Sequence, residues 1–291
     1  MPERHNTCPA QPGRPAGAGR TAGAAAAGAA ARSSRALDAR TLYLAAAEPL
    51  RVTSTGEALV ISRPHCGTMG EVQRVPVARV LRVVCNDSVE WSGAALALCL
   101  QRGITVSWLD GRGAELGHLW PQRPRRTDLA EALDMLAGSE PGWSDSYRHW
   151  LRHQRLAVLQ VWQGERARAG HPVGEAEWQL AKRSWVYQDE LADHLPPLLH
   201  GLAAALVAHR LSECGLSSHY WCCAGEPMEL VQDLTRLVWA EMNLCAGALA
   251  DAVDHPREAA ALFERWSGRC VGALHQHLAN LRAHALRELH G

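Results

Sequence analysis

The stretch SGAALALCLQRGITVSWLDGRGAELGHL, residues 92–119, combines the signals of a helix, a turn and two strands. Ser92 can cap a helix over residues 92–103, and Gly103 can end it because glycine tolerates a left-handed backbone. The following GITVSWLD is a short β-branched run that ends at an Asp-Gly turn. The stretch therefore predicts one small helix inserted between strands.

Upstream, the same sequence pattern of short predicted strands extends back to Thr41. Short runs with β-branched residues are separated by Thr-Gly, Gly-Thr-Met-Gly and Asp-Gly turns; the runs are TLYL, LRVT, EALVIS and QRVPVARVLRVVC. This pattern predicts a compact, β-rich domain over residues 41–120. Residues 1–40 are rich in Ala, Gly, Pro and Arg without apolar periodicity, and we expect them to be a disordered extension.

Downstream, PQRPRR (121–126) is predicted to be a linker, and the strand signal ends there. Apolar residues then recur with a spacing near 3.6, which predicts helices over 127–137, 145–168, 175–192, 197–214, 228–250 and 256–288. Residues 127–291 are therefore predicted to be an α-helical domain. Strands followed by helices in separate parts of the chain indicate the α+β fold class.

The composition limits the possible classes of protein. No run of eighteen apolar residues occurs, and the first forty residues lack a secretory apolar region, so we expect a cytoplasmic protein. Nine irregularly spaced cysteines argue against a disulfide framework. Cys214, His219, Cys222 and Cys223 could hold zinc, but zinc sites usually draw on two separated pairs and no second pair is evident.

The charge balance does not by itself indicate a nucleic-acid-binding protein. The chain has 30 basic and 30 acidic residues and a formal net charge of zero. Lys182 is the one lysine, so the positive charge is carried by arginine, whose planar fork matches phosphate oxygens. A GC-rich genome produces arginine as well, and both explanations stay open for any single arginine.

Several of these segments, in this order, resemble the CRISPR-associated integrase family, the Cas-one proteins that insert spacers into CRISPR arrays. In the β-rich domain the resemblance lies in TLYL, VPVARVLRVV and, most specifically, residues 92–119. In the helical domain, YRHWLRHQRLAVL is similar to the family's long basic helix, and PPLLHGLAAALVAHRLSECGL to the helix before its Gly-Leu turn. The resemblance covers nearly all of the chain after residue 41.

The resemblance implies an enzyme of antiviral defence, a metal-dependent DNA endonuclease and integrase of CRISPR adaptation. The family inserts prespacer DNA into the repeat by transesterification from a 3′-hydroxyl. It also implies a divalent metal, Mg²⁺ or Mn²⁺, held by a glutamate, a histidine and an aspartate. A positive clamp suits this chemistry because charge develops on the phosphoryl oxygens, and hard carboxylate oxygens suit these two ions.

Two of the implied catalytic and metal-binding residues match the family's motifs. Glu177, with Ala181 and Trp185 at the family's spacing, corresponds to the glutamate, although Trp178 replaces the usual glycine. Asp233 in ELVQDL corresponds to the aspartate. Aspartate is a poor residue for a helix interior, which also favours a role for Asp233, whereas Glu177 has an equally valid interpretation as a solvated helix residue.

The histidine and a second acidic position depart from the family pattern. Position-by-position alignment places Ala224 at the histidine, and His219, five residues earlier, is our candidate ligand; it could equally be a loop histidine without a role. Arg236 stands where the family often has a second acidic residue, and it would either repel a metal or contact a phosphate. His200 is predicted to lie in the core or an interface.

The resemblance also implies partners: a homodimer formed through the β-rich domain, a small Cas-two protein, and double-stranded DNA as prespacer and CRISPR repeat. Arg148, Arg152, Arg155 and Arg236 are the candidate DNA-binding residues, with a solvated helix face as the alternative. Two further hypotheses stay open. One is a catalytically weakened family member acting as a DNA-binding scaffold, and the other is an unrelated β-plus-helical nucleic-acid-binding protein.

Overall fold

Residues 92–119 form the predicted elements: α2 (Gly93–Arg102), β7 (Thr105–Leu109) and β8 (Glu115–Leu119). The Ser92 side chain accepts a hydrogen bond from the backbone N–H of Ala95, and Gly103 ends the helix with a φ of 72°. This computed structural model describes residues 39–45, 49–65, 68–121, 127–139, 142–191, 195–216, 228–244 and 256–290. From Arg40 onward the chain is one compact unit.

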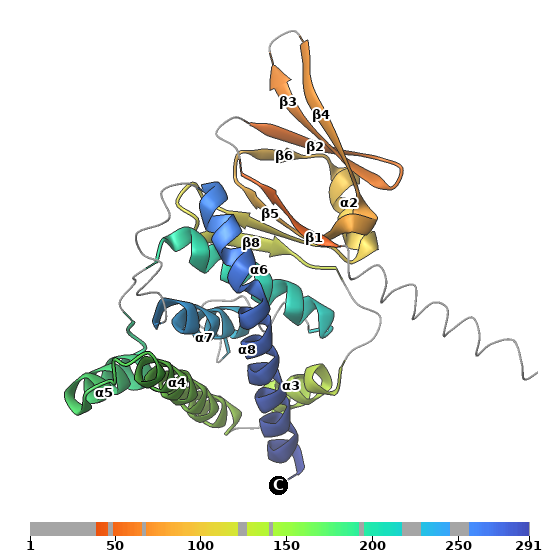
Figure 1. Cartoon of the computed structure of the whole chain (residues 1–291). Helices are drawn as coiled ribbons and strands as arrows, with labels where there is room; N and C mark the ends of the chain where they lie inside the picture. The colour runs from red at the N-terminus through yellow and green to blue at the C-terminus, as the bar shows by residue number, and fades with distance from the viewer. Residues whose placement is uncertain are drawn as a thin grey trace, which may run out of the picture. The chain divides into compact units, whose positions relative to one another are not determined.

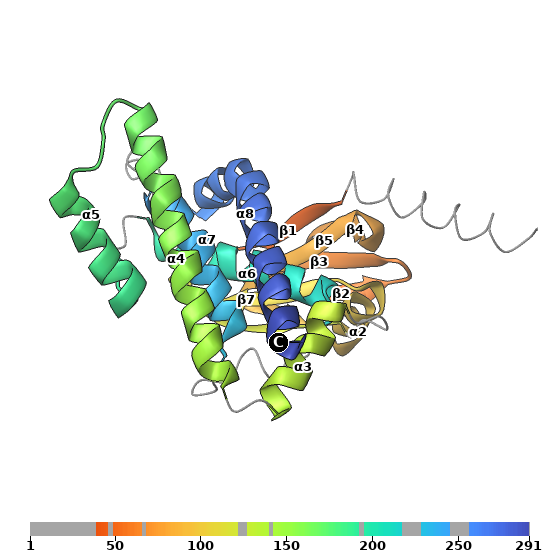
Figure 2. The same ribbon diagram turned by 90° about the horizontal axis from the view of Figure 1, so that it is seen from below.

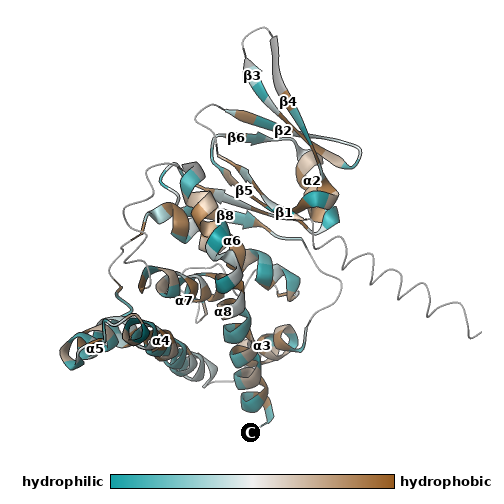
Figure 3. Ribbon diagram, viewed as in Figure 1, coloured by the Kyte–Doolittle hydropathy of each residue, from teal (hydrophilic) through white to brown (hydrophobic). Residues whose placement is uncertain are grey.

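The strands form two four-stranded mixed sheets (Figure 1). The first has the order β1-β5-β7-β8, and the second β4-β3-β2-β6. The remaining bounds are β1 (Arg40–Leu44), β2 (Leu50–Thr55), β3 (Ala58–His65), β4 (Thr68–Pro76), the 3₁₀ turn η1 (Val77–Arg79), β5 (Val80–Asn86) and β6 (Val89–Trp91). β2 and β3 carry both hydrophobic and hydrophilic residues (Figure 3), as strands with one buried face do.

The first sheet is covered on both faces, which explains its apolar runs. β1, β5 and β7 run parallel, and parallel strands are usually buried on both sides. On β5, Val83 and Cys85 belong to the core of the β-rich part, whereas Val84 belongs to the core of the helical part. The sheet therefore joins two hydrophobic cores.

The helical part follows the predicted pattern with one exception. Its helices are α3 (Asp128–Ser139), α4 (Trp143–Arg168), α5 (Glu175–Ala181), α6 (Pro197–Glu213), α7 (Leu230–Leu244) and α8 (Pro256–His290). The predicted helix over 175–192 instead continues from α5 into a π-helix, η2 (Lys182–Gln188), and ends at Asp189 with a φ of 59°. With this exception, the predicted α+β class, β-rich first and all-helical second, is confirmed.

Helix α6 is the centre of the helical part and packs on the first sheet. Ala203, Ala204, Leu206 and Val207 are fully buried, and a helix that is apolar on all sides belongs inside a core. Gly201 allows its close approach, because a Cβ there would lie 2.1 Å from the backbone oxygen of Gly113 in the β7–β8 turn.

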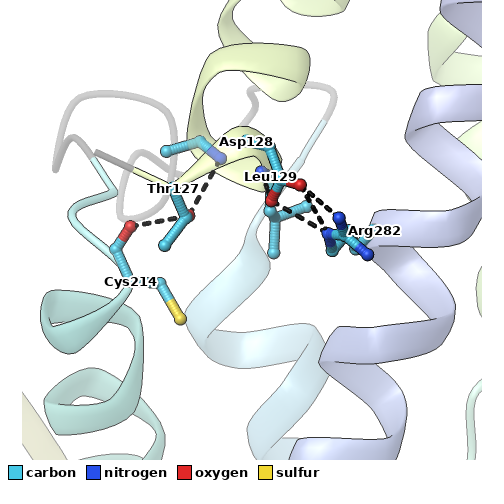
Figure 4. Close-up of polar contacts among 6 residues, drawn as sticks. Thr127, Asp128, Leu129, Cys214 and Arg282 are labelled. Atoms are coloured by element: carbon cyan, nitrogen blue, oxygen red, sulfur yellow. Dashed lines mark hydrogen bonds and ion pairs between the residues drawn. The ribbon is translucent and has the colours of Figure 1, made fainter. Parts of the chain in front are cut away.

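Polar contacts tie the long helix α8 to the rest of the unit (Figure 4). Arg282 donates hydrogen bonds of 2.9 and 2.8 Å to the two carboxylate oxygens of Asp128, which begins α3. Thr127 donates a 2.9 Å hydrogen bond to the carbonyl oxygen of Cys214 at the end of α6. The start of the helical part is thereby attached to both α6 and α8. No helix among the described residues is long and apolar enough to cross a membrane.

Candidate active site

Asp233 lies in the first turn of α7 and points toward α4. The apolar face of α7, with Leu230, Leu234 and Leu237 fully buried, fixes the rotation of the helix. Asp233 then lies at the boundary of this face, where its Oδ2 accepts a 2.8 Å hydrogen bond from the hydroxyl of Tyr147 on α4. Tyr147 is itself 1% exposed. This hydrogen bond holds the carboxylate in a single orientation at a half-buried position.

The pKa of Asp233 reflects this position. Burial raises the pKa of Asp233 above its ordinary value of 3.8, and the Tyr147 hydrogen bond and the charge of Arg155 oppose the rise. Burial also raises the pKa of Tyr147, as does the nearby Asp233 carboxylate. A carboxylate that costs free energy to keep charged is a common feature of functional sites.

Beside Asp233, Asp189 binds two arginines. Arg155 Nη2 forms a 2.7 Å ion pair with Asp189 Oδ1, and the Arg236 guanidinium pairs with Asp189 Oδ2. Arg236 Nη2 also donates a 2.7 Å hydrogen bond to the backbone oxygen of Asp189. Arg155 is 8% exposed, and its guanidinium carbon lies 5.2 Å from the ring centroid of Trp185. We call Tyr147, Arg155, Asp189, Asp233 and Arg236 the Asp233 cluster.

A pocket of about 400 Å³ adjoins the cluster. Its polar lining includes Gln232 and Arg236 from α7 and His200 from α6, and its aromatic lining includes Trp185 and Trp239. The rings of His200 and Trp239 meet edge to face with centroids 5.4 Å apart. His200 thus lines the pocket, and the prediction that it lies in the core or an interface stays a prediction.

Glu177 lies elsewhere on the helical part. Its carboxylate is about half exposed and pairs at 4.0 Å with Arg166, near the C-terminal end of α4. Tyr147, the partner of Asp233, is near the other end, and about five turns, or roughly 28 Å, separate these two positions of α4. In Figure 2, α5 lies along the side of α4 away from α7. The structure does not bring Glu177 into contact with Asp233.

The other predicted residues divide between exposed, buried and undescribed positions. His219, Cys222, Cys223 and Ala224 lie outside the described residues, so the choice of histidine ligand stays a prediction. Arg148 and Arg152 are exposed, whereas Arg155 and Arg236 are engaged by Asp189. Burial raises the pKa of the Cys214 thiol, which disfavours the thiolate that a zinc site needs.

The described residues do not by themselves form the Mg²⁺ or Mn²⁺ site that the resemblance implies, and the proposed His219 ligand lies outside them. Within the described part of the chain, no group of three or more His, Cys, Asp or Glu residues could hold a metal ion. The Asp233 carboxylate accepts from Tyr147, the Asp189 carboxylate neutralises two guanidinium groups, and Glu177 is distant. The cluster as described is suited to hold two arginines and one desolvated carboxylate in fixed positions.

Sequence reasoning missed Tyr147 and Asp189. Tyr147 lies on the apolar face of α4 with Trp143 and Trp150, and a hydroxyl on such a face is a weak signal that a polar partner is nearby. Asp189 has no sequence signal beyond its tolerance of a left-handed backbone. Both residues acquire their roles only when α4, η2 and α7 meet.

Comparison with known proteins identifies similar chains. Residues 43–138 match the family model described as CRISPR associated protein Cas1. The crystal structure of a TtCas1–DNA complex is similar over 83% of this chain and 91% of that chain, with 15% identity and a TM-score of 0.54. The crystal structure of TtCas1 covers 83% of this chain and 97% of that chain, with 17% identity and a TM-score of 0.52.

A third similar structure, a CAS1 protein from Thermotoga maritima, covers 86% of this chain and 94% of that chain, with 11% identity and a TM-score of 0.53. No curated protein matches the chain in sequence. At these identities the three structures show that the fold is shared. The family model covers residues 43–138, which include most of the β-rich part and nearly all of α3.

Proposed function

We propose that this chain, which belongs to the Cas1 family of CRISPR-associated proteins, is a DNA integrase and endonuclease of CRISPR adaptation. It would join a prespacer to the CRISPR repeat by transesterification from a DNA 3′-hydroxyl. The observation that carries the proposal is Asp233, a carboxylate kept half buried and hydrogen-bonded at the position that matches the family's aspartate. A buried aspartate lowers the stability of the folded protein, and groups of this kind are concentrated at functional sites.

The metal enters this proposal through the family alone. Mg²⁺ or Mn²⁺, when bound, stabilises charge on the phosphoryl oxygens during strand joining. Glu177, His219 and Asp233 stay the proposed ligands. In the described contacts, Glu177 pairs with Arg166, and Asp233 accepts a hydrogen bond from Tyr147.

A second candidate function is a DNA-binding scaffold of the adaptation complex. The contacts of the Asp233 cluster favour this role. Asp189 already pairs with both Arg155 and Arg236, and Asp233 already accepts a hydrogen bond from the Tyr147 hydroxyl. Arg236 also places a positive charge where the family often has an acidic side chain, and a positive charge opposes cation binding. Under this proposal the fold and the DNA contacts persist without efficient chemistry.

Both candidates include the same partners. TtCas1 has been solved in complex with DNA, and we propose double-stranded DNA, as prespacer and repeat, for this chain too. Arg148 and Arg152, exposed on α4, are the proposed phosphate contacts, because arginine forks bind phosphate oxygens in pairs. A homodimer through the β-rich part and a small Cas-two partner complete the proposed assembly.

A strand-transfer assay tests the integrase. A duplex with free 3′-hydroxyl ends is incubated with a supercoiled plasmid, with and without Mn²⁺ or Mg²⁺, and joined products are resolved on a gel. We expect products from the wild type, and a loss of at least about 100-fold in Asp233→Asn, because the amide keeps the shape of the side chain and removes its charge. Asp145→Asn, which changes an exposed carboxylate on α4, is the matched control and should retain activity.

The scaffold predicts a different outcome in the same experiment. Wild-type protein would give no products while binding the duplex, with an affinity that falls steeply as salt increases. Products from the wild type that persist in Asp233→Asn would contradict the role of this carboxylate. Absence of both products and duplex binding would contradict both candidate functions.

A further inference from the structure

His149 and His153 lie one turn apart on the exposed face of α4, and their rings converge. Their Nε2 atoms are 3.0 Å apart and share a hydrogen bond, and the ring centroids are 4.6 Å apart with the planes at 78°. Two of the three residues between them, Trp150 and Leu151, are buried and anchor the helix beneath the pair. We propose that this pair, the His149–His153 site, binds a divalent transition-metal ion such as Cu²⁺ or Ni²⁺.

The separation of the two nitrogens indicates which metals fit. A metal–nitrogen bond is about 2.0–2.1 Å long, so two Nε2 atoms 3.0 Å apart subtend roughly 90–95° at a shared ion. That is the angle between neighbouring ligands in square-planar and octahedral coordination, which Cu²⁺ and Ni²⁺ adopt. A tetrahedral angle would require a separation of roughly 3.3 Å. The separation is compatible with Cu²⁺ and Ni²⁺, and the usual order of affinities at nitrogen sites places Cu²⁺ above Zn²⁺.

Imidazole nitrogens also distinguish this site from a Mg²⁺ site. Mg²⁺ prefers oxygen ligands and keeps its waters, whereas imidazole suits Cu, Ni and Zn. Because both rings are exposed, water can fill the remaining coordination positions, and the ion can exchange with solvent. His284, from α8, has a separate partner, because its Nε2 lies 3.0 Å from the Ser146 hydroxyl oxygen.

The charges around the site determine whether a substitution nearby strengthens or weakens metal binding. Arg148 is paired with Asp145 at 2.7 Å in an exposed ion pair, which reduces its effect on a cation bound nearby. Arg152 is exposed, lies three residues after His149 and precedes His153, close enough for its positive charge to oppose a bound cation. Removing that charge should strengthen metal binding.

The test is a titration of the full-length protein with Ni²⁺ and, separately, Cu²⁺ by calorimetry. Variants are His149→Ala, His153→Ala and the double substitution, with His275→Ala, an exposed histidine of α8, as the matched control. Copper EPR of the same samples reports the number of nitrogen ligands. Alanine at exposed helix positions preserves the fold, which the far-UV CD spectrum checks.

The proposal predicts that each single substitution abolishes the binding of the same one equivalent of metal, or lowers its affinity at least tenfold. The double substitution should remove no further metal. This non-additivity indicates a shared ion. Arg152→Gln should tighten binding, and His275→Ala should leave it unchanged. The proposal is overturned if either single variant keeps the full stoichiometry and affinity, or if His275→Ala loses as much as the paired variants.

Discussion

The hydroxyl of Tyr147 on α4 donates a 2.8 Å hydrogen bond to Oδ2 of Asp233 on α7, across 86 positions of sequence. It connects two helices and orients the carboxylate that we propose as a catalytic residue and metal ligand. Asp189 lies beside it with Arg155 and Arg236, so each acidic group of the cluster has a defined partner. This arrangement determines which substitutions should cost stability and which should cost function.

Asp233→Asn should separate function from stability. Burial raises the pKa of Asp233, so the folded state binds its proton more tightly than the unfolded state does. The stability that this proton contributes is complete below pH 3.8 and is lost as the pH rises through the folded-state pKa. At pH 7 the asparagine variant should equal the wild type or exceed it by up to about 1 kcal/mol.

Urea unfolding at pH 4 and pH 7 measures this difference. The variant should lose less stability between the two pH values than the wild type does. A variant that is less stable than the wild type at pH 7 would show that the Asp233 charge is structural.

Asp189→Asn should be strongly destabilising. Asparagine tolerates the left-handed backbone at this position, so the substitution removes mainly the charge. Arg155, 8% exposed, would then lack its carboxylate, and a buried ion pair that loses one member costs about 3–5 kcal/mol. Asp145→Asn breaks the exposed pair with Arg148 and should cost less than about 1 kcal/mol. Equal unfolding free energies for the two variants would contradict the burial of the Asp189 pairs.

Gly201→Ala should disrupt the packing of α6 on the first sheet. The new Cβ would lie 2.1 Å from the Gly113 oxygen and 2.8 Å from Leu109 Cδ2, which forces the helix away from the β7–β8 turn. We expect a loss of about 3 kcal/mol, measured by chemical unfolding. Gly268→Ala on α8 meets no atom within 4 Å and should gain about 0.5–1 kcal/mol from helix propensity. Stabilisation by both substitutions would show that α6 does not approach the turn.

Arg152→Gln should weaken DNA binding in a manner that depends on salt. If Arg152 contacts one phosphate, its loss lowers the slope of log affinity against log salt by about one, with little dependence on base sequence. Arg51→Gln, in the ion pair with Glu90 on the second sheet, is the control and should leave the slope unchanged. Fluorescence anisotropy of a labelled duplex at several salt concentrations measures both. An equal change in the two variants would remove the reason to place the DNA contact on α4.

Local sequence patterns determined most of the elements. Ser92 and Gly103 bound α2 as predicted because capping and helix termination depend on a residue's own side chain and backbone preference. The period of apolar residues located α3, α4, α6, α7 and α8 for a similar reason: it records which face each helix buries. The π-helix at 182–188 is too short for its longer repeat to change the apolar pattern, so the sequence could not distinguish it from an α-helix.

The candidate site could be predicted only in part. Asp233 was predicted because aspartate is unfavourable inside a helix and its surroundings resemble a family motif, and its functional role stays a prediction. The partners that define its chemistry, Tyr147 and the Asp189 pairs, come from segments far apart in sequence. Only the packing of α4, η2 and α7 decided that these side chains meet and that Glu177 pairs with Arg166 instead. Periodicity reports burial within one segment, whereas contact between segments depends on how their buried faces fit together.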